Sequence, residues 1–271
     1  MAKLNFWNLM VVKDDCILSA VELMLSIKKT LDFKTKSFIR KSKKVINSKK
    51  KTGYMFVVLN GPSVKNQDLT ILQGKDLMFV NRGFLHPLYK QLKPKYHVFI
   101  DTKMVYGIWD IKWIDIIVGM VPDITIVLPA EWAKLEVFEP YVLNKEISII
   151  WVSSGGGFRG LGVSGTAFDL AIELGYQKIY FTGFEATGFA QNILKQATHF
   201  FGYIDDNELQ KPEDFMQGYY MNCRQIRELI LYAKKAKKKN VQIINLTNGG
   251  LLDMFERMNF NDLNPTKTIL K

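Results

Sequence analysis

The sequence predicts an α/β protein with a Rossmann-like, doubly wound and mostly parallel sheet of about seven strands. From Tyr54 onward, short runs rich in β-branched and aromatic residues alternate with stretches that favour helices. Most of these short runs are continuously apolar, which is typical of strands buried on both faces. The chain has 271 residues, of which 48% are hydrophobic, so it is long enough to bury one large core.

Seven segments have the composition of buried strands. In chain order they are Tyr54–Leu59, Asp76–Val80, Tyr96–Ile100, Ile124–Leu128, Ile147–Val152, Lys178–Thr182 and Val241–Leu246. Helices are expected over Ser164–Leu174, Cys223–Lys238 and Leu251–Met258. The first of them has its apolar residues on one face and stops at Gly175. Residues 188–221 show no strong period, so we expect a lid-like insertion there.

The basic charge is concentrated near the N-terminus, although the whole chain has a formal net charge of +11. Residues 28–51 contain 11 basic side chains and one acidic one, which gives this segment a net charge of +10. Residues 52–271 contain 24 basic and 22 acidic side chains, which gives +2. We therefore divide the chain into a basic N-terminal arm, residues 1–52, and a domain, residues 53–271. Because the domain is close to neutral, its composition does not favour an extended nucleic-acid groove.

The arm combines apolar and basic segments. Apolar residues dominate positions 6–12 and 17–27, and the lysine-rich segment follows them. This pattern favours an amphipathic element on an anionic membrane surface, and a solvated linker is the alternative. No apolar run reaches the roughly 20 residues of a membrane span, and the arm lacks the pattern of a secretory signal. We therefore expect a cytoplasmic protein that is peripheral at the inner face of the cytoplasmic membrane.

The sequence offers little for metal or cysteine chemistry. The two cysteines, Cys16 and Cys223, are too few for a disulfide framework or a four-cysteine zinc site. The HExxH and GxSxG patterns are absent from the chain. We predict neither a bound metal nor a cofactor.

The turn after the first predicted strand is a candidate ligand site, because ligands of open parallel sheets bind beyond the carboxyl ends of the strands. This turn reads Asn60-Gly61-Pro62-Ser63. Gly61 permits close approach of the backbone, Pro62 fixes φ, and Ser63 can cap the next helix. Such a turn would leave amides free for a phosphate, and a structural tight turn is the alternative.

Polar side chains also follow three other predicted strands. Asn81 follows the second strand and could contact a base or a ribose. Asp101 follows the third, where a carboxylate can bind a ribose hydroxyl, a metal or an acceptor, or simply cap a helix. Glu185 places a second carboxylate shortly after the sixth strand.

A glycine-rich segment, residues 153–162, leads into the predicted helix that begins with Ser164, Gly165 and Thr166. The first amides of that helix could bind an anion or a base. Arg159 within the segment could supply positive charge to a leaving phosphate. A flexible loop in solvent is the alternative interpretation.

The chain has three histidines. His97 lies in a predicted strand and His86 precedes a proline, so both are interpreted as structural. His199 lies in the irregular insertion, where an imidazole could act as a general base or simply occupy the surface.

Taken in chain order, these motifs resemble those of the bacterial sialyltransferases of glycosyltransferase family 42. They also resemble a wider related group that contains motility accessory factors and a pterin pyrophosphokinase. The first turn resembles the Asn-Gly-Pro-Ser-Leu motif of that family, and Asn81 and Asp101 match its polar residues after the next two strands. Ser164-Gly165 and the segment 174–185 resemble its later motifs, so the resemblance covers about residues 55–256.

The resemblance implies a metal-independent, sialyltransferase-like glycosyltransferase. It would move sialic acid or a related sugar from a CMP-linked nucleotide-sugar donor onto a glycan or lipid-linked glycan of the cell surface. His199 would be the general base, and Asp101 and Glu185 would contact the ribose or the acceptor. The residues expected at the donor are Asn60, Gly61, Pro62, Ser63, Asn81, Ser164, Gly165 and Thr166, with Arg159 near the phosphate.

The chain departs from the family pattern in two places. Residues 186–189 lack the two tyrosines that stabilise the leaving phosphate in the sialyltransferases, and Glu185 replaces the usual aspartate. A magnesium-dependent pyrophosphokinase or other nucleotide-phosphate transferase, with Asp101 and Glu185 as ligands, is one alternative. A non-enzymatic binder of anionic surfaces or nucleic acid through the arm is the other. A homo-oligomer is compatible with the sequence.

Overall fold

The computed structural model describes residues 32–48, 53–153, 162–202 and 212–263, together with Ala20. Its centre is one sheet of eight parallel strands in the order β5-β4-β3-β2-β1-β6-β7-β8, which confirms the predicted α/β, Rossmann-like fold. The strands are β1 (Tyr54–Val58), β2 (Leu77–Val80), β3 (Tyr96–Val98), β4 (Thr125–Pro129), β5 (Ser148–Val152), β6 (Lys178–Thr182), β7 (Gln242–Asn245) and β8 (Glu256–Arg257).

The direction of winding reverses between β1 and β6. From β1 the chain builds outward through β2, β3, β4 and β5, and it then returns to the other side of β1 with β6. Strand β1 pairs with both β2 and β6, and the carboxyl ends of all three strands lie at one edge of the sheet. This reversal is a topological switch point, which is where open α/β sheets bind ligands.

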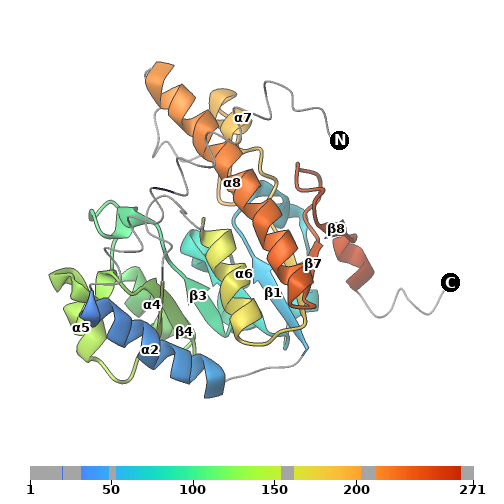
Figure 1. Cartoon of the computed structure of the whole chain (residues 1–271). Coiled ribbons are helices and arrows are strands. Elements are labelled where there is room, and N and C mark those ends of the chain that lie inside the picture. Colours follow the sequence, from blue (N-terminus) through green and yellow to red (C-terminus); the bar gives the residue numbers. More distant parts are fainter. Residues whose placement is uncertain (1–19, 21–31, 49–52, 154–161, 203–211, 264–271) are drawn as a thin grey trace.

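Long helices cover one face of the sheet. Helices α6 (Val163–Glu173) and α8 (Pro212–Lys238) lie side by side over it, as Figure 1 shows. Alternate residues of the strands, such as Val57, Met78 and Phe181, point toward this layer and are fully buried. A Cβ at Gly165 would lie 2.8 Å from Tyr232 Cε2, so the glycine permits the close packing of α6 against α8.

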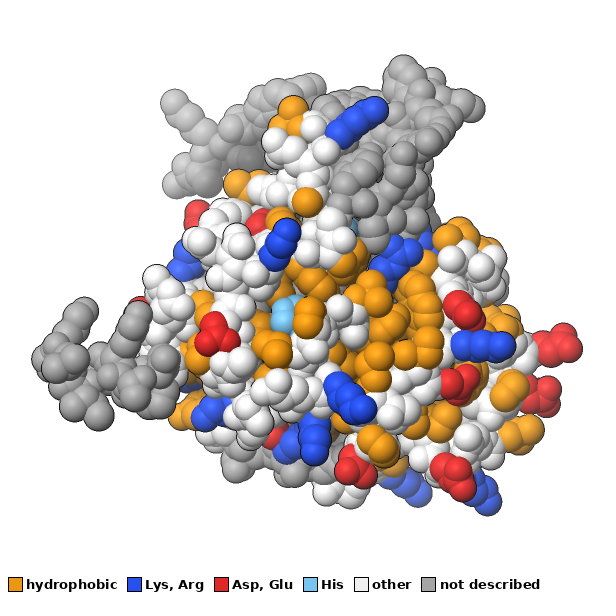
Figure 2. All heavy atoms as spheres, turned by 180° about the vertical axis from the view of Figure 1, so that it is seen from behind, with side chains coloured by type: hydrophobic (Ala, Val, Ile, Leu, Met, Phe, Trp, Pro, Cys, Tyr) orange, Lys and Arg blue, Asp and Glu red, His pale blue; other side chains and the backbone are white. Residues whose placement is uncertain are grey.

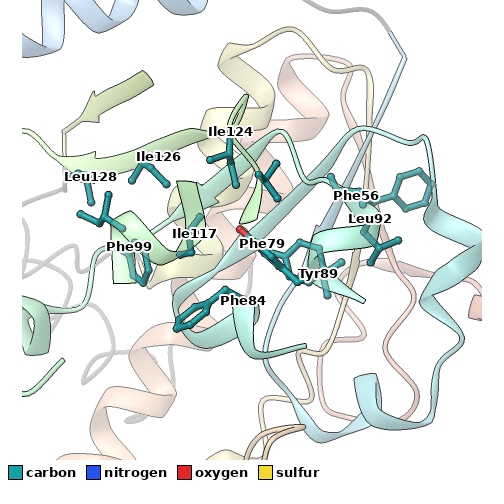
Figure 3. Packing of buried hydrophobic residues seen from close by; sticks show 14 of the residues in the cluster. Phe56, Phe79, Phe84, Tyr89, Leu92, Phe99, Ile117, Ile124, Ile126 and Leu128 are labelled. Atoms are coloured by element: carbon teal, nitrogen blue, oxygen red, sulfur yellow. The ribbon is translucent and has the colours of Figure 1, made fainter. Parts of the chain in front are cut away.

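Short elements cover the opposite face. The helices are α3 (Tyr89–Leu92), α4 (Trp113–Met120) and α5 (Glu139–Leu143). The 3-10 turns are η1 (Pro62–Asn66), η2 (Leu69–Leu72), η3 (Asn81–Leu85), η4 (Thr102–Met104), η5 (Trp132–Lys134), η6 (Glu136–Phe138) and η7 (Phe260–Leu263). Figure 3 shows how Phe79, Phe84 and Tyr89 pack together within this core. Figure 2 shows that hydrophobic side chains also reach the surface on this side of the molecule.

Part of the predicted N-terminal arm is a helix packed on the sheet. Helix α2 (Phe33–Ser48) lies against the edge strand β5, where Ser42 Oγ accepts a 2.8 Å hydrogen bond from the amide of Trp151. The ring of Phe38 lies 5.6 Å from that of Trp151. Asp32 caps the helix through the amide of Thr35 at 3.0 Å. The rest of the arm, apart from Ala20, lies outside the described residues, and the boundary near residue 52 stays a prediction.

Two of the helices predicted from the sequence differ in the structure. One segment is not helical, and the other helix begins earlier than predicted. The segment Leu251–Met258 was expected to be helical, but it is a turn followed by β8, which pairs with β7. Arg257 explains this, because its guanidinium donates to the carbonyls of Gly249 at 2.8 Å and Gly250 at 3.1 Å and fixes the turn. Helix α8 begins at Pro212 instead of Cys223. Proline is favourable at the first position of a helix, because no intrahelical hydrogen bond from its nitrogen is needed there.

The predicted insertion, residues 188–221, is therefore partly helical. It contains α7 (Gly188–Ile193), a short bridge between His199 and Gly202, and the start of α8, while residues 203–211 lie outside the described part. In the part of the chain that the structure describes, we find no helix long and apolar enough to cross a membrane.

Candidate functional site

The candidate site lies at the switch point, where the turns after β1 and β6 contact each other. The amide of Gly61 donates to the carbonyl of Gly183 at 2.7 Å. Gly183 has a φ of +72°, and a Cβ there would lie 2.5 Å from Val64 Cγ2 and 2.6 Å from the carbonyl oxygen of Leu59. A glycine is therefore required for the two turns to come this close.

The carboxylate of Glu185 lies over the turn after β1. Its Oε1 accepts the amide of Ser63 at 2.8 Å, and a Cβ at Gly61 would lie 2.7 Å from its Cδ. From the sequence, Ser63 was expected to cap the following helix and the amides of this turn were expected to stay free. The structure differs, because the residue before η1 is Gly61, without a side-chain cap, and Glu185 caps the amide of Ser63.

Four predicted site residues carry a buried polar atom that has no hydrogen-bond partner among the described residues. Buried polar groups in folded proteins are nearly always paired, so each unpaired atom calls for a ligand, a water molecule or another explanation. Two are acceptors and two are hydroxyls, which can donate or accept. They are Asn60 Oδ1, Asn81 Oδ1, Ser63 Oγ and Thr166 Oγ1.

The hydrogen bond of Nδ2 fixes the orientation of the Asn60 side-chain amide. Asn60 Nδ2 donates to the carbonyl of Val80 at 3.2 Å, and a carbonyl can only accept. The nitrogen must therefore face Val80, and the oxygen is the atom left without a partner in the described part of the chain.

Asn81 is held in an unusual conformation by a buried histidine. Its φ is +46°, in the left-handed region, and its carbonyl lies 2.8 Å from Nε2 of His97. Because the carbonyl only accepts, Nε2 of His97 carries the proton and Nδ1 accepts the hydroxyl of Tyr89 at 2.8 Å. A chain of two hydrogen bonds thus runs from Tyr89 through His97 to the backbone of Asn81.

Burial keeps His97 neutral. The side chain is fully buried, and desolvation lowers its pKa to about 3. His97 therefore has the structural role expected from its place in a strand. His86 is half-buried, burial lowers its pKa, and its Nδ1 accepts the amide of Leu88 at 3.2 Å. Nothing in the sequence marks Tyr89 or His97 as support for Asn81, because only the fold brings the three residues together.

His199 lies beside the turn after β1. The next amide in the chain, that of Phe200, donates to the carbonyl of Asn60 at 2.9 Å, and the Phe200 ring lies 5.4 Å from that of His86. His199 itself is half-buried, stacks on Phe201 at 4.9 Å, and its Nδ1 lies 2.8 Å from Thr198 Oγ1. The structure therefore brings the predicted base to the same edge as Asn60.

The start of α6 reaches this edge because α6 runs back along the sheet from the carboxyl ends of the strands (Figure 1). Ser164 and Thr166 in its first turn are each 3% exposed, and Gly162 precedes the helix without a side-chain cap. A Cβ at Gly162 would lie 2.9 Å from Nε2 of Gln225, so α8 also borders the helix start. Arg159 lies outside the described residues, and its predicted place near a phosphate stays a prediction.

Asp101 acts as a cap in this structure. Its Oδ1 accepts the amide of Lys103 at 3.0 Å, at the start of η4. Its carboxylate thus resembles that of Glu185 in binding a backbone amide after a strand. Among the described residues, no group of three or more histidine, cysteine, aspartate or glutamate side chains is placed to hold a metal ion.

A cationic aromatic cluster, which the sequence analysis did not identify, borders Asn81. The guanidinium of Arg82 lies 5.4 Å from the rings of both Trp109 and Trp113. Lys103 Nζ lies 5.9 Å from the Trp109 ring. The contributing residues come from η3, η4, the segment after η4 and the start of α4, so no local sequence pattern could have predicted the cluster.

Comparisons with known proteins give similarity at the level of the fold. No protein-family model matches the chain, and no curated protein matches its sequence. A MAf glycosyltransferase from Magnetospirillum magneticum AMB-1 has a TM-score of 0.49 and 10% identity over 86% of this chain. This chain spans 40% of the length of that protein.

Two structures of a sialyltransferase are also similar. CstII from Campylobacter jejuni, in complex with a substrate analogue, cytidine-5'-monophosphate, has a TM-score of 0.40 and 16% identity, covering 76% of this chain and 84% of that one. A sialyltransferase CST-II with a trisaccharide acceptor and CMP has a TM-score of 0.41 and 17% identity, over 75% and 84% of the two chains.

Proposed function

We propose that this protein is a glycosyltransferase that uses a nucleotide-sugar donor, CMP-linked and carrying sialic acid or a related sugar. The observation that carries the proposal is the set of four buried polar atoms at the switch point that have no partner among the described residues. They belong to Asn60, Ser63, Asn81 and Thr166, residues that the sequence motifs independently assign to the donor. Buried polar atoms without a partner among the described residues, gathered at such an edge, can each bond to a polar ligand.

The chemical types of these atoms suit a nucleotide. The amide oxygens of Asn60 and Asn81 can only accept hydrogen bonds. A nucleotide offers suitable donors in the hydroxyls of its ribose and the amino group of a cytosine base. The hydroxyl of Ser63 can donate to an oxygen of the base or the ribose, and that of Thr166 to a phosphate oxygen. Thr166 lies in the first turn of α6, where helix amides favour a negative phosphate.

His199 is the proposed base. The acceptor hydroxyl attacks the anomeric carbon, the bond between that carbon and the phosphate oxygen breaks, and CMP leaves with the electron pair. The hydroxyl proton passes to the imidazole. If Nδ1–H of His199 donates to Thr198 Oγ1, Nε2 is the unprotonated ring nitrogen and is the atom that takes up the proton. A base in this role contributes roughly 10²–10⁴ to the rate.

The proposed acceptor is a glycan or lipid-linked glycan at the cell surface, met at the inner face of the cytoplasmic membrane. Helix α2 supports this placement, because its outward side carries only basic charge. Thr35, Ser42 and Ile46 face the domain. Its exposed basic residues are Lys34, Lys36, Arg40, Lys41, Lys43 and Lys44, and no acidic residue lies in the helix. Anionic lipids attract such a surface with about 1 kcal/mol per lysine or arginine.

A turnover assay tests the proposed chemistry. Purified protein is incubated with a CMP-linked sialic acid and a mixture of glycan acceptors in excess chelator, and released CMP and sugar-extended acceptor are measured. The proposal predicts transfer that chelator does not reduce. Activity that requires added magnesium and produces a pyrophosphorylated product would contradict it and favour the nucleotide-phosphate transferase.

A further inference from the structure

The carboxylate of Glu185 occupies the position in which the turn after β1 would hold an anion. Its Oε1 lies 2.8 Å from the amide nitrogen of Ser63. The other side of the carboxyl group lies so close to Gly61 that any larger residue there would collide with Oε2. An acidic side chain from the neighbouring strand therefore takes the place of an external anion.

No amide of residues 61–64, all of which the structure describes, is left for a phosphate. Gly61 donates to the carbonyl of Gly183 at 2.7 Å, and Val64 donates to the carbonyl of Gly61 at 3.2 Å. Ser63 donates to Glu185, and Pro62 has no N–H group. The turn has the sequence of a phosphate cradle, yet the backbone amides of Gly61, Ser63 and Val64 all donate inside the protein.

The loop after β7, the strand beside β6, holds the backbone of Glu185. Leu251 donates to the carbonyl of Glu185 at 2.9 Å, and a Cβ at Gly250 would lie 2.5 Å from that carbonyl oxygen. Thr247 Oγ1 accepts the amide of Phe184 at 3.2 Å. Since the loop after β7 holds this segment closely, the carboxylate is part of a built arrangement that spans three strands.

We propose that Glu185 determines specificity by excluding a phosphate from the turn after β1. A phosphate entering there would meet a like charge at close range and would have to break the bond to Ser63, which is charge-assisted. The start of α6, where Thr166 Oγ1 has no partner among the described residues, is then the position that we assign to the single phosphate. The site accepts a nucleoside with one phosphate and rejects a nucleoside diphosphate. This inference rests on the proposed nucleotide site and states which ligands that site rejects.

Two substitutions of Glu185 separate its charge from its volume. Glu185→Gln keeps the shape and the bond from Ser63 but removes the charge. Glu185→Ala removes the side chain and frees the amide of Ser63. Asp68→Asn is the matched control, because Asp68 also caps a 3-10 turn, accepting the amide of Thr70 at 3.0 Å, and lies outside the switch point.

The measurements are isothermal titrations of each protein with CMP and with CDP, and the change in melting temperature with inorganic phosphate. We expect the wild type and Asp68→Asn to bind CMP at least about tenfold more tightly than CDP. Both Glu185 variants should reduce this preference by about tenfold. Phosphate should raise the melting temperature of Glu185→Ala more than that of the wild type, because ligands of the folded state stabilise it.

Two results would overturn the inference. One is that the proteins bind CMP but the ratio of CDP to CMP affinity changes less than about twofold in both Glu185 variants. The other is an equal phosphate effect on the wild type and Glu185→Ala. If no protein binds either nucleotide, the proposed function fails separately, and the phosphate titration alone then decides whether Glu185 excludes an anion.

Discussion

At the scale of single residues, the proposed site depends on partners that touch no ligand. Asn81 keeps a left-handed backbone because His97 holds its carbonyl, and His97 keeps its orientation because Tyr89 binds its other nitrogen. Non-glycine residues adopt such a backbone at a cost that the surrounding structure must offset. Tyr89 and His97 are therefore positioning residues for Asn81.

Tyr89→Phe should weaken CMP binding about tenfold, because it removes one hydrogen bond that fixes His97 and hence Asn81. The measurement is isothermal titration with CMP. Tyr141→Phe is the matched control, since this buried hydroxyl donates to Asp115 at 2.9 Å, away from the site. The control should lose similar stability but keep its affinity. Equal affinity in the two variants would contradict the positioning role.

Stability should decrease in acid because of His97. Its pKa is about 3 in the folded state and about 6.5 when unfolded, so the unfolded chain binds the extra proton between these values. The stabilisation is complete above about pH 6.5 and is lost as the pH falls toward 3. At pH 5 the loss is about 2 kcal/mol.

The check is urea unfolding of the wild type and His97→Gln at pH 7 and pH 5. The glutamine side chain has no group that titrates, so most of the pH dependence should disappear in the variant. His86, whose pKa burial also lowers, accounts for what remains. A variant whose free energy of unfolding falls as much as that of the wild type would show that other groups cause the effect.

His199→Ala should reduce the rate of sugar transfer by roughly 10²–10⁴, because it removes the proposed base. Its affinity for CMP should stay within about twofold of the wild type, since the proposed base acts on the acceptor hydroxyl and not on the nucleotide. Steady-state transfer and CMP titration measure the two quantities. Turnover within about tenfold of the wild type would show that His199 is not the base.

At the scale of elements, continuous runs of apolar residues predicted the strands well, but the same kind of pattern predicted the helices poorly. The central strands are buried on both faces, so their runs are apolar throughout. Helix α2 was missed because lysines dominate its composition, although Thr35, Ser42 and Ile46 fall on one helical face. Strand β8 has two exposed residues, Glu256 and Arg257, and the bonds of Arg257 to the preceding loop place it.

Helix α2 should control membrane association. Replacing Lys36, Lys43 and Lys44 together by glutamine should weaken binding to vesicles containing phosphatidylserine by about a hundredfold at low salt. The control replaces three exposed lysines, Lys237 and Lys238 at the end of α8 and Lys239 directly after it, and should bind as the wild type does.

Vesicle sedimentation and an assay with duplex DNA measure the two possible partners of α2. We expect the α2 variant to lose vesicle binding and the wild type to bind DNA only weakly. If both triple variants bind vesicles equally well, α2 is not the membrane contact. DNA binding that is lost with the α2 lysines would favour the nucleic-acid interpretation of the arm.

At the scale of the whole molecule, the switch point is the feature that the sequence motifs could not locate. The motifs after β1, β2 and β6 are far apart in the chain, and Ser63 and Glu185, which share a hydrogen bond, are separated by 122 positions. Only the strand order, which places β6 beside β1, brings them to one edge. The sequence thus identified the polar residues, but their contacts, and the use of the turn amides by Glu185, follow from the topology.

If the switch point binds a nucleotide with one phosphate, CMP should stabilise the protein more than nucleotides with two or three phosphates do. A thermal-shift panel of CMP, CDP, UDP, GDP and ATP measures this, since a ligand that binds the folded state raises the melting temperature. We expect the largest rise with CMP and the loss of that rise in a double variant, Asn60→Ala with Asn81→Ala. A larger rise with any other nucleotide, or an unchanged rise in the double variant, would contradict it.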